Sequence, residues 1–321
     1  MGAVSTEIQF ELVPDWPDPV PHWPRAEAPG IAVDGEDNVY LFVRGEIPVR
    51  IYDRTGHAVH AWESVSFKRP HAIAIAGGLV YCVDDWGHAI SIFSPDGQLT
   101  ARLERSPDVE YPQLTDPEHP DTILTAGPPF NLPTGIAISP TGDSYVSDGY
   151  GNARVHHFDP ARELVASWGS PGSDPGQFRL PHGVAIDAGG RLYVSDRLNC
   201  RVQVFSAEGA YLTEWPARWP NNVVFDSEGL AYVAELGGVF ADGPAADLTH
   251  PRARVTVRDS SGPVLTELLE PDPTGSGRFY APHAVAVDSH GDLYVTEVPD
   301  SYTFDQAPAS WPVVRKYARV G

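Results

Sequence analysis

The sequence predicts an all-β fold arranged as a six-bladed β-propeller. One pattern recurs six times: a short β-branched run, a turn rich in Gly and Asp, and a second short run centred on Tyr-Val. The repeats span residues 30–45, 70–85, 133–149, 181–196, 220–235 and 282–297. Helical periodicity is almost absent from these segments. Repeated units of this kind are expected to stack, and six such units favour a ring. A β-helix or a β-sandwich fits the repeat period less well.

The first element is a strand-like run over residues 6–13, which precedes the first repeat. We expect it to pair with the last repeat and close the ring, because the outer edge of that blade would otherwise be unpaired. The Trp- and Pro-rich stretch 14–24 is predicted to pack across the outside as an extended strap. Residues 1–321 are therefore interpreted as one propeller domain, with 1–24 as closing strand and strap.

Each repeat continues into a third strand-like run: VRIYD, AISIFSPDG, RVHHFD, RVQVFSAEG, RVTVRDSSG and VVRKYA. Fourth runs are less clear, as in LVASWGS and YLTEW. Each unit is thus predicted to be a four-stranded blade with its innermost strand first. In this geometry the start of the innermost strand and the end of the second strand lie on the same face of the ring.

Composition excludes several partners. The formal charge is −21, with 22 Lys+Arg against 43 Asp+Glu, which argues against nucleic acid and against an anionic membrane surface. No apolar run approaches the ~20 residues needed to span a bilayer. The N-terminus lacks the features of a signal peptide. The two cysteines, Cys82 and Cys200, suit a reducing compartment. These features predict a cytoplasmic protein.

Three Pro-His motifs provide the main functional indication: RPHAIAI with His71, LPHGVAI with His182 and APHAVAV with His283. They open the second, fourth and sixth repeats, so their imidazoles should surround the axis with approximate threefold symmetry. Three neutral imidazoles suit a divalent metal such as Zn²⁺ with an open fourth position, which is typical of catalytic zinc. The alternative is that Pro-His recurs through duplication and that the rings only pack or bond carbonyls.

Other residues are predicted to reach the same face. The odd repeats place Gly30, Thr134 and Asn221 near the histidine position, and none is a strong ligand. The ends of second strands bring Arg44, Asp85, Tyr150 and Arg197 to this face, where cations are expected to be few. Acidic residues end five second strands, and we interpret them as turn and inter-blade hydrogen-bond acceptors, with support of the histidines as the alternative: Asp84, Asp148, Asp196, Glu235 and Glu297.

The repeat resembles the NHL repeat, most clearly in RLYVSDRLNCRVQVFSAEG (191–209). The Pro-His motifs, together with DGYGNARV (148–155) and FVRGE (42–46), resemble the peptidyl-α-hydroxyglycine α-amidating lyase family over roughly residues 25–317. The resemblance implies a propeller with zinc on the three histidines, Tyr150 as base on the substrate hydroxyl, and Arg44 engaging the substrate. It also implies cleavage of the C–N bond of an α-hydroxyglycine to an amide and glyoxylate.

The substrate would then be a small molecule or a peptide C-terminus, and ureidoglycolate-like compounds contain the same carbinolamide unit. The chain departs from the family at several positions. Ala281 and Ala284 replace a methionine and an aspartate around the last histidine, and that aspartate belongs to a calcium site in the family, which makes calcium doubtful here. Gly151 replaces a cysteine, the disulfide pattern is missing, and we expect no fused monooxygenase domain.

Two other functions fit the same motifs. One is a zinc-dependent hydrolase or hydratase of the lactonase type. The other is a non-catalytic NHL-repeat binding module. Metal content would separate the binding module from the two enzymes, and glyoxylate release would separate the lyase from the hydrolase.

Overall fold

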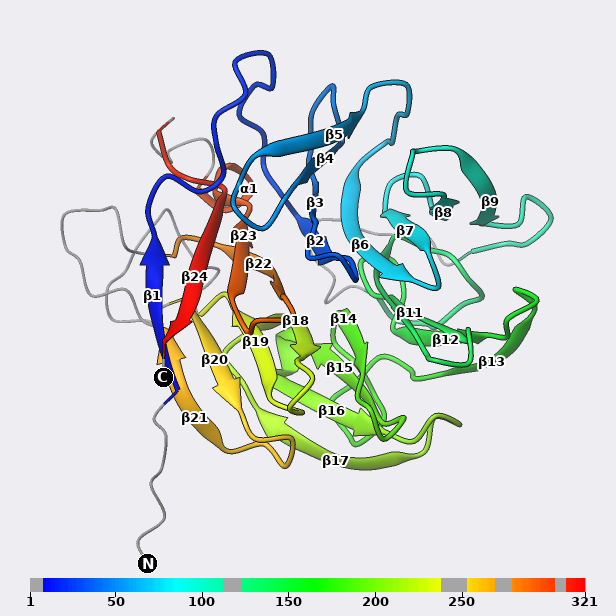
Figure 1. Ribbon diagram of the computed structural model, residues 1–321. Helices are drawn as coiled ribbons and strands as arrows, with labels where there is room; N and C mark the ends of the chain where they lie inside the picture. Colours follow the sequence, from blue (N-terminus) through cyan, green and yellow to red (C-terminus); the bar gives the residue numbers. More distant parts are fainter. Residues whose placement is uncertain (1–7, 112–122, 238–252, 269–278, 304–309, 321) are drawn as a thin grey trace, which may run out of the picture.

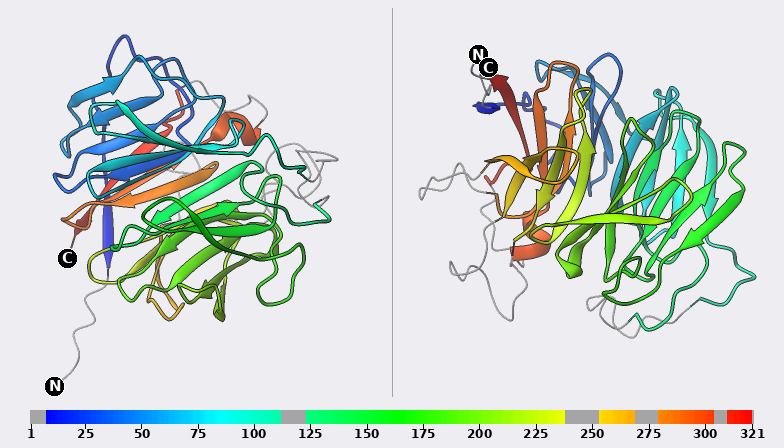
Figure 2. Two further views of the ribbon diagram at one scale, coloured as in Figure 1. Left: turned by 90° about the vertical axis from the view of Figure 1, so that its right-hand side faces the viewer. Right: turned by 90° about the horizontal axis from the view of Figure 1, so that it is seen from below.

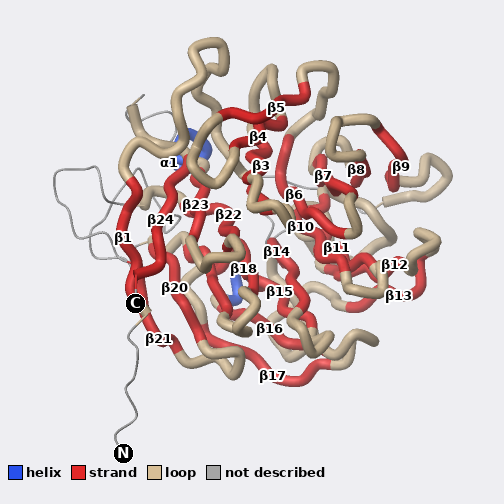
Figure 3. Tube along the Cα trace, viewed as in Figure 1, coloured by secondary structure: helices blue, strands red, loops and turns tan. Residues whose placement is uncertain are grey.

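The computed structural model describes residues 8–111, 123–237, 253–268, 279–303 and 310–320. Six four-stranded antiparallel sheets form a ring, which confirms the predicted six-bladed propeller (Figure 1). The innermost strands surround the central axis, and the blades stand around that axis when the molecule is seen from the side (Figure 2). Strands joined by loops dominate the trace (Figure 3).

The strands of each blade are given from the innermost outward. The first blade contains β2 (Gly30–Val33), β3 (Val39–Phe42), β4 (Val49–Tyr52) and β5 (Ala58–Trp62), and the second contains β6 (Pro70–Ala76), β7 (Leu79–Asp84), β8 (Ala89–Phe93) and β9 (Leu99–Glu104). The third contains β10 (Pro133–Ile138), β11 (Ser144–Asp148), β12 (Arg154–Phe158) and β13 (Leu164–Trp168). The next two are β14 (Pro181–Ile186), β15 (Leu192–Asp196), β16 (Arg201–Phe205) and β17 (Tyr211–Pro216); and β18 (Pro220–Phe225), β19 (Ala231–Glu235), β20 (Arg254–Arg258) and β21 (Val264–Leu268).

The sixth blade closes the ring with strands from both ends of the chain. It contains β22 (Pro282–Val287), β23 (Leu293–Glu297), β24 (Val314–Val320) and, outermost, β1 (Gln9–Val13). Strand β1 runs antiparallel to β24, from Gln9 opposite Val320 to Val13 opposite Lys316. The predicted closure by an N-terminal strand is therefore confirmed, although residues 6 and 7 of the predicted run lie outside the described part of the chain.

Apolar side chains fill the spaces between neighbouring blades rather than a single central core. Six clusters of buried hydrophobic residues each join two adjacent blades. The second strands are almost entirely buried because both of their faces contact neighbouring blades. From the predicted strap, Trp16 enters the cluster between the first and sixth blades, with its ring centroid 4.9 Å from that of Tyr294.

The acids that end five second strands have a structural role. Each carboxylate accepts hydrogen bonds from backbone N–H groups just before the innermost strand of its own blade. The pairs are Asp84 with Lys68 and Arg69, Asp148 with Asn131, Asp196 with Arg179, Glu235 with Arg218, and Glu297 with Tyr280 and Ala281. The interpretation as hydrogen-bond acceptors is confirmed, with the contacts made to the connection that leads into the same blade rather than to a neighbouring blade. These contacts fix the connection that leads into each innermost strand, including the three that carry Pro-His.

Helical structure is slight. A 3₁₀ turn, η2, spans Arg197–Asn199, and a short helix, α1, spans Pro299–Thr303 between β23 and β24. Within the described residues, no helix is long and apolar enough to cross a membrane. Cys82 and Cys200 are both free thiols, the first buried and the second exposed.

Candidate metal centre

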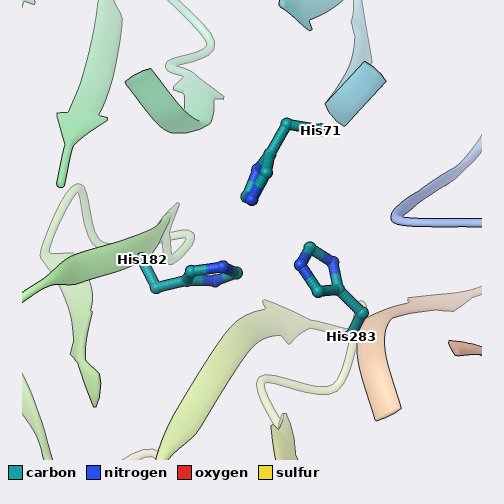
Figure 4. Close-up of side chains that lie close together, drawn as sticks. All are labelled: His71, His182 and His283. Carbon is teal, nitrogen blue, oxygen red and sulfur yellow. The ribbon is translucent and has the colours of Figure 1, made fainter. Parts of the chain in front are cut away.

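The three histidines occupy equivalent places in alternate blades. His71, His182 and His283 are the second residues of β6, β14 and β22. At each of them the pairing with the second strand shifts register, so the histidine stands outside the regular ladder. A bulge of this kind redirects a side chain. Figure 4 shows the three imidazoles converging on one point from three strands.

The cluster is compact and buried. One ligand atom from each histidine lies within 4.8 Å of the others, and the ring centroids are 4.8 to 4.9 Å apart. The exposed fractions of the three residues are 0%, 1% and 3%. A zinc ion about 2.0–2.1 Å from each nitrogen would need the nitrogens about 3.4 Å apart. A small inward movement of the imidazoles would therefore create a three-coordinate site, and these histidines could hold a metal ion.

Backbone carbonyls of the odd blades set the tautomer of every imidazole. Nδ1 of His71 donates to Thr134 O at 2.6 Å, Nδ1 of His182 to Asn221 O at 2.8 Å, and Nδ1 of His283 to Pro29 O at 2.6 Å. Because a carbonyl can only accept, each Nδ1 carries the proton and each Nε2 presents a lone pair. Metal-bound histidines commonly have such an acceptor on the other ring nitrogen.

The same burial keeps the imidazoles neutral. Desolvation lowers the pKa of His71, His182 and His283 well below 6.5, and nearby guanidinium groups lower it further. A neutral imidazole is the form that binds a metal. The three histidines thus converge on one point, share one tautomer and are neutral, and all three properties favour metal binding. The rings bond backbone carbonyls, as the alternative interpretation of the Pro-His repeat predicts, and this arrangement leaves Nε2 available to a metal ion.

Tyr150 lies at this cluster. It follows β11, and its hydroxyl is 3.2 Å from Nε2 of His71 and 3.0 Å from Nε2 of His182. The hydroxyl has one proton, so it can donate to only one of these two acceptors at a time. A cation held by the histidines would satisfy both lone pairs. The donor set therefore fits a metal ion.

Arg44 also reaches the cluster, but it is ion-paired. Its Nη1 lies 2.9 Å from Glu27 Oε2 and 2.8 Å from Ser301 Oγ, and its Nε is 3.4 Å from Pro70 O. The salt bridge is the structural alternative for an arginine in an acidic chain. Arg44 nonetheless lowers the pKa of His71 and His283, which places its charge close to both rings. Its Nη2 makes no hydrogen bond within the described residues.

Two further arginines flank Tyr150, so cations at this rim are more numerous than the sequence analysis expected. The guanidinium carbons of Arg69 and Arg197 lie 5.6 and 5.8 Å from the centre of the Tyr150 ring. Arg69 also lies 3.5 Å from the buried carboxylate of Asp85, whose pKa is raised to about 7, chiefly by burial. These two arginines were missed as site residues, although the predicted geometry had placed Arg197 and Asp85 on this face.

Arg197 has the most unusual environment of the three. It is 4% exposed, and its Nε and Nη2 have no hydrogen-bond partner within the described residues. It lowers the pKa of all three histidines. It also opposes, but does not cancel, the effect of burial on Tyr302 of α1, whose pKa is raised to about 12. Burying two guanidinium nitrogens without hydrogen-bond partners is costly, and an anion bound at the centre would offset that cost.

The departures from the amidating-lyase motifs have local explanations. A Cβ added at Gly151 would lie 2.5 Å from Asn131 O, so the cysteine of the family does not fit without a shift of the backbone. Ala284 lies in the apolar cluster with Ile31 and Tyr294, and Ala281 packs with Leu236 and Val298. Nothing at Ala284 replaces the missing carboxylate, and calcium remains without support from these residues.

Comparisons with known proteins agree with the repeats and the motifs. The NHL repeat model matches residues 130–158 and 178–205, in the third and fourth blades. Peptidyl-alpha-hydroxyglycine alpha-amidating lyase 1 of Drosophila melanogaster is 28% identical over 263 residues, which cover 76% of this chain and 45% of that protein. NHL repeat-containing protein 3 of Homo sapiens is 28% identical over 238 residues, covering 70% and 63% of the respective chains.

The fold has a solved counterpart. A virginiamycin B lyase from Staphylococcus aureus aligns with a TM-score of 0.57 and 14% identity, covering 98% of this chain and 99% of that one. At this identity the likeness concerns the fold alone. The chain spans less than half the length of the amidating enzymes that it matches: 45% of the Drosophila protein and 36% and 34% of two Xenopus laevis monooxygenases. The chain therefore contains NHL repeats and is similar, at modest identity, to amidating lyases and to other NHL-repeat proteins.

Proposed function

We propose that this protein is a metal-dependent C–N lyase that cleaves a carbinolamide to an amide and glyoxylate. The observation that carries the proposal is the convergence of three neutral imidazoles, two of which, His71 and His182, contact the hydroxyl of Tyr150. The similarity to an amidating lyase over three quarters of the chain supports the same reaction. His71, His182 and His283 would hold the metal, and zinc fits this ligand set best.

The reaction needs a proton to leave the α-hydroxyl and a C–N bond to break. A divalent metal at the three histidines would bind the hydroxyl and acidify it. Tyr150, reacting as the phenolate after giving up its own proton to solvent, would take the hydroxyl proton. The C–O bond would become the aldehyde of glyoxylate, and the electron pair of the C–N bond would pass to nitrogen. Tyr150 can then return the proton to that nitrogen. The amide leaves as a neutral product, and no water is consumed.

The arginines indicate a substrate that carries a carboxylate. Arg44, Arg69 and Arg197 all contribute positive charge at the histidines, in a chain whose formal charge is −21. A divalent cation would add to that charge. An α-hydroxyglycine carboxylate would compensate it, with Nη2 of Arg44 or the unpaired nitrogens of Arg197 as donors. The substrate would be an N-acyl or N-carbamoyl α-hydroxyglycine, as a small molecule or at a peptide C-terminus.

Metal analysis and glyoxylate release test this function. Protein purified without added metal should contain about one divalent metal per chain, and His182→Ala should lose it. The wild-type protein should release glyoxylate from α-hydroxyhippurate. Metal-free native protein would favour a binding module, and a bound metal without glyoxylate release would favour a hydrolase or hydratase.

The role of Arg44 has its own test. Arg44→Ala and Arg44→Lys should lower kcat/KM on α-hydroxyhippurate about 10- to 150-fold, because one charge-assisted contact contributes ~1.5–3 kcal/mol. The decarboxylated analogue should be affected far less. Equal losses on both compounds would exclude recognition of the carboxylate by Arg44.

A further inference from the structure

The proline carbonyl before each candidate ligand accepts a hydrogen bond from the odd blade that precedes it. Thr134 Oγ1 lies 2.7 Å from Pro181 O, and Asn221 Nδ2 lies 2.8 Å from Pro282 O. In the first blade Gly30 has no side chain, and Arg44 Nε takes this place at 3.4 Å from Pro70 O. Each Pro-His unit is thus held through its backbone by the blade before it.

Backbone carbonyls of the odd blades also accept hydrogen bonds from the imidazoles of the even blades that precede them. His71 donates to the carbonyl of Thr134, whose own hydroxyl bonds the carbonyl before His182. His182 donates to the carbonyl of Asn221, whose amide bonds the carbonyl before His283. His283 donates to the carbonyl of Pro29, and Arg44 of the same blade completes the circuit at Pro70. The contacts form one closed ring in which even-blade ligands alternate with odd-blade residues.

We propose that Thr134 and Asn221 are positioning residues, which couple the three histidines through this ring and thereby set the affinity and geometry of the metal centre. The inference rests on the proposed function for the presence of a metal, but it concerns residues that make no contact with it. Both residues stand at register shifts equivalent to those of the histidines. Their side chains are therefore also released from the regular ladder toward the axis.

Burial makes these two contacts effective. Thr134 and Asn221 are each 1% exposed, and hydrogen bonds in such surroundings are not weakened by competition with water. The Thr134 hydroxyl has one proton, and its contacts with Ser147 are longer, at 3.1 Å, than the contact with Pro181. The Asn221 Oδ1 is buried without a partner within the described residues, so the contact of Nδ2 with Pro282 is the amide's contribution to this site.

Two roles are distinguishable for the hydrogen bonds of Thr134 and Asn221. They could only hold neighbouring blades together, or they could also position the histidines, and the two roles predict different effects of mutation on metal affinity. Loss of a structural bond lowers stability and leaves the metal affinity of the folded protein unchanged. Loss of a positioning bond loosens one ligand relative to the others, which lowers affinity and changes the coordination geometry. Mutations of outer-shell partners of metal ligands typically cost 10–100-fold in metal affinity.

Cobalt(II) provides a readout that does not depend on turnover. Metal-free wild type, Thr134→Val and Asn221→Leu would be titrated with Co²⁺ and followed by visible d–d absorption, with folding checked by circular dichroism. Both variants should bind Co²⁺ about 10- to 100-fold more weakly and show altered bands. Thr296→Val is the matched control, because the buried Thr296 hydroxyl also bonds a carbonyl, that of Ala284, but lies outside the ring. It should retain wild-type affinity and spectrum.

The outcomes separate the two proposals. No Co²⁺ binding by the wild type would refute the proposed function itself. Tight binding by the wild type with unchanged affinity and bands in folded Thr134→Val would overturn the positioning role, as would an equal loss in Thr296→Val. If Asn221→Leu fails to fold, Thr134→Val decides the matter, because valine has nearly the shape of threonine.

Discussion

His71, His182 and His283 can act together because each has one fixed tautomer and no charge. Three protonated imidazoles with ring centroids less than 5 Å apart would repel one another, and burial removes that form. The carbonyls of Thr134, Asn221 and Pro29 then direct all three Nε2 lone pairs inward. The orientation and the neutral charge state that a bound cation requires are therefore already present in the protein without a metal.

Tyr150→Phe separates catalysis from metal binding. The substitution removes only the hydroxyl, which contacts the histidines but is not needed to hold a metal between them. We expect bound metal to stay within twofold of wild type and kcat on α-hydroxyhippurate to fall about 10²- to 10⁴-fold, the usual contribution of a general acid–base group. Metal analysis and a glyoxylate assay on the same preparation make the measurement. Loss of metal in proportion to activity would assign Tyr150 to metal binding instead.

Arg197→Met should stabilise the protein while impairing it. The guanidinium is buried with two unpartnered nitrogens, so methionine of similar length should raise the free energy of unfolding by about 1 kcal/mol or more. The same change should lower kcat/KM for a carboxylate-bearing substrate, because the substrate carboxylate would lose the cation that pairs with it. Urea unfolding of the metal-free protein and steady-state kinetics provide the two values. A variant that is less stable and fully active would mean that Arg197 is structural.

The sequence predicts only those parts of the candidate site that depend on the type of side chain at a position. The Pro-His repeat identified the histidines, and DGYGNARV and FVRGE identified Tyr150 and Arg44. The acceptors of the imidazole N–H groups could not be predicted, because every residue has a backbone carbonyl. Arg197 was placed on the correct face. That two of its nitrogens have no hydrogen-bond partner in the described part of the chain could not be predicted, since pairing depends on side chains from several blades.

At the scale of elements, one contact between blades recurs around the ring. A tryptophan at the end of an outer strand packs on a left-handed glycine in the outer turn of the next blade. The pairs are Trp62 with Gly97, Trp168 with Gly209, and Trp215 with Gly262. Trp16 follows β1 and makes the same contact with Gly56, so the strap tryptophan has the place of this residue in the sixth blade. This contact across the closure gives Trp16 a packing role equivalent to that of the outer-strand tryptophans.

Gly209→Ala tests the energetic contribution of this contact. An added Cβ would lie 2.7 Å from Trp168 Cδ2, and the glycine has a φ of +85°. Gly190→Ala is the matched control, with a φ of +79° and no atom within 4 Å of the new Cβ. Both variants should lose about 1–2 kcal/mol of unfolding free energy from the left-handed backbone, and Gly209→Ala a further ~1–3 kcal/mol from overpacking. If urea unfolding shows the same loss of unfolding free energy in both variants, the Trp168 side chain moves aside without an energetic penalty.

For the whole molecule, the histidine cluster brings together side chains from three alternate blades. A metal there would tie the second, fourth and sixth blades together, while β1 and β24 close the circle at the periphery. The same cluster has a cost in the absence of metal. Three neutral imidazoles are buried at the centre of the ring, and in the unfolded chain each would be free to take up a proton below pH 6.5.

The free energy of unfolding should therefore depend on pH in a specific way. The pKa of each histidine is lower in the folded protein than in the unfolded chain, so below about pH 6.5 the unfolded chain binds more protons. The resulting penalty is absent above pH 6.5, and it grows as pH falls toward the folded-state pKa values. Each histidine adds up to about 1.4 kcal/mol per pH unit to this slope. Urea unfolding with a chelator between pH 5 and 8 should show a shallower acid decline for His182→Gln than for wild type. Identical slopes would mean that His182 is already protonated in the folded protein or remains unprotonated in the unfolded chain, and either result would contradict a neutral metal-ready imidazole.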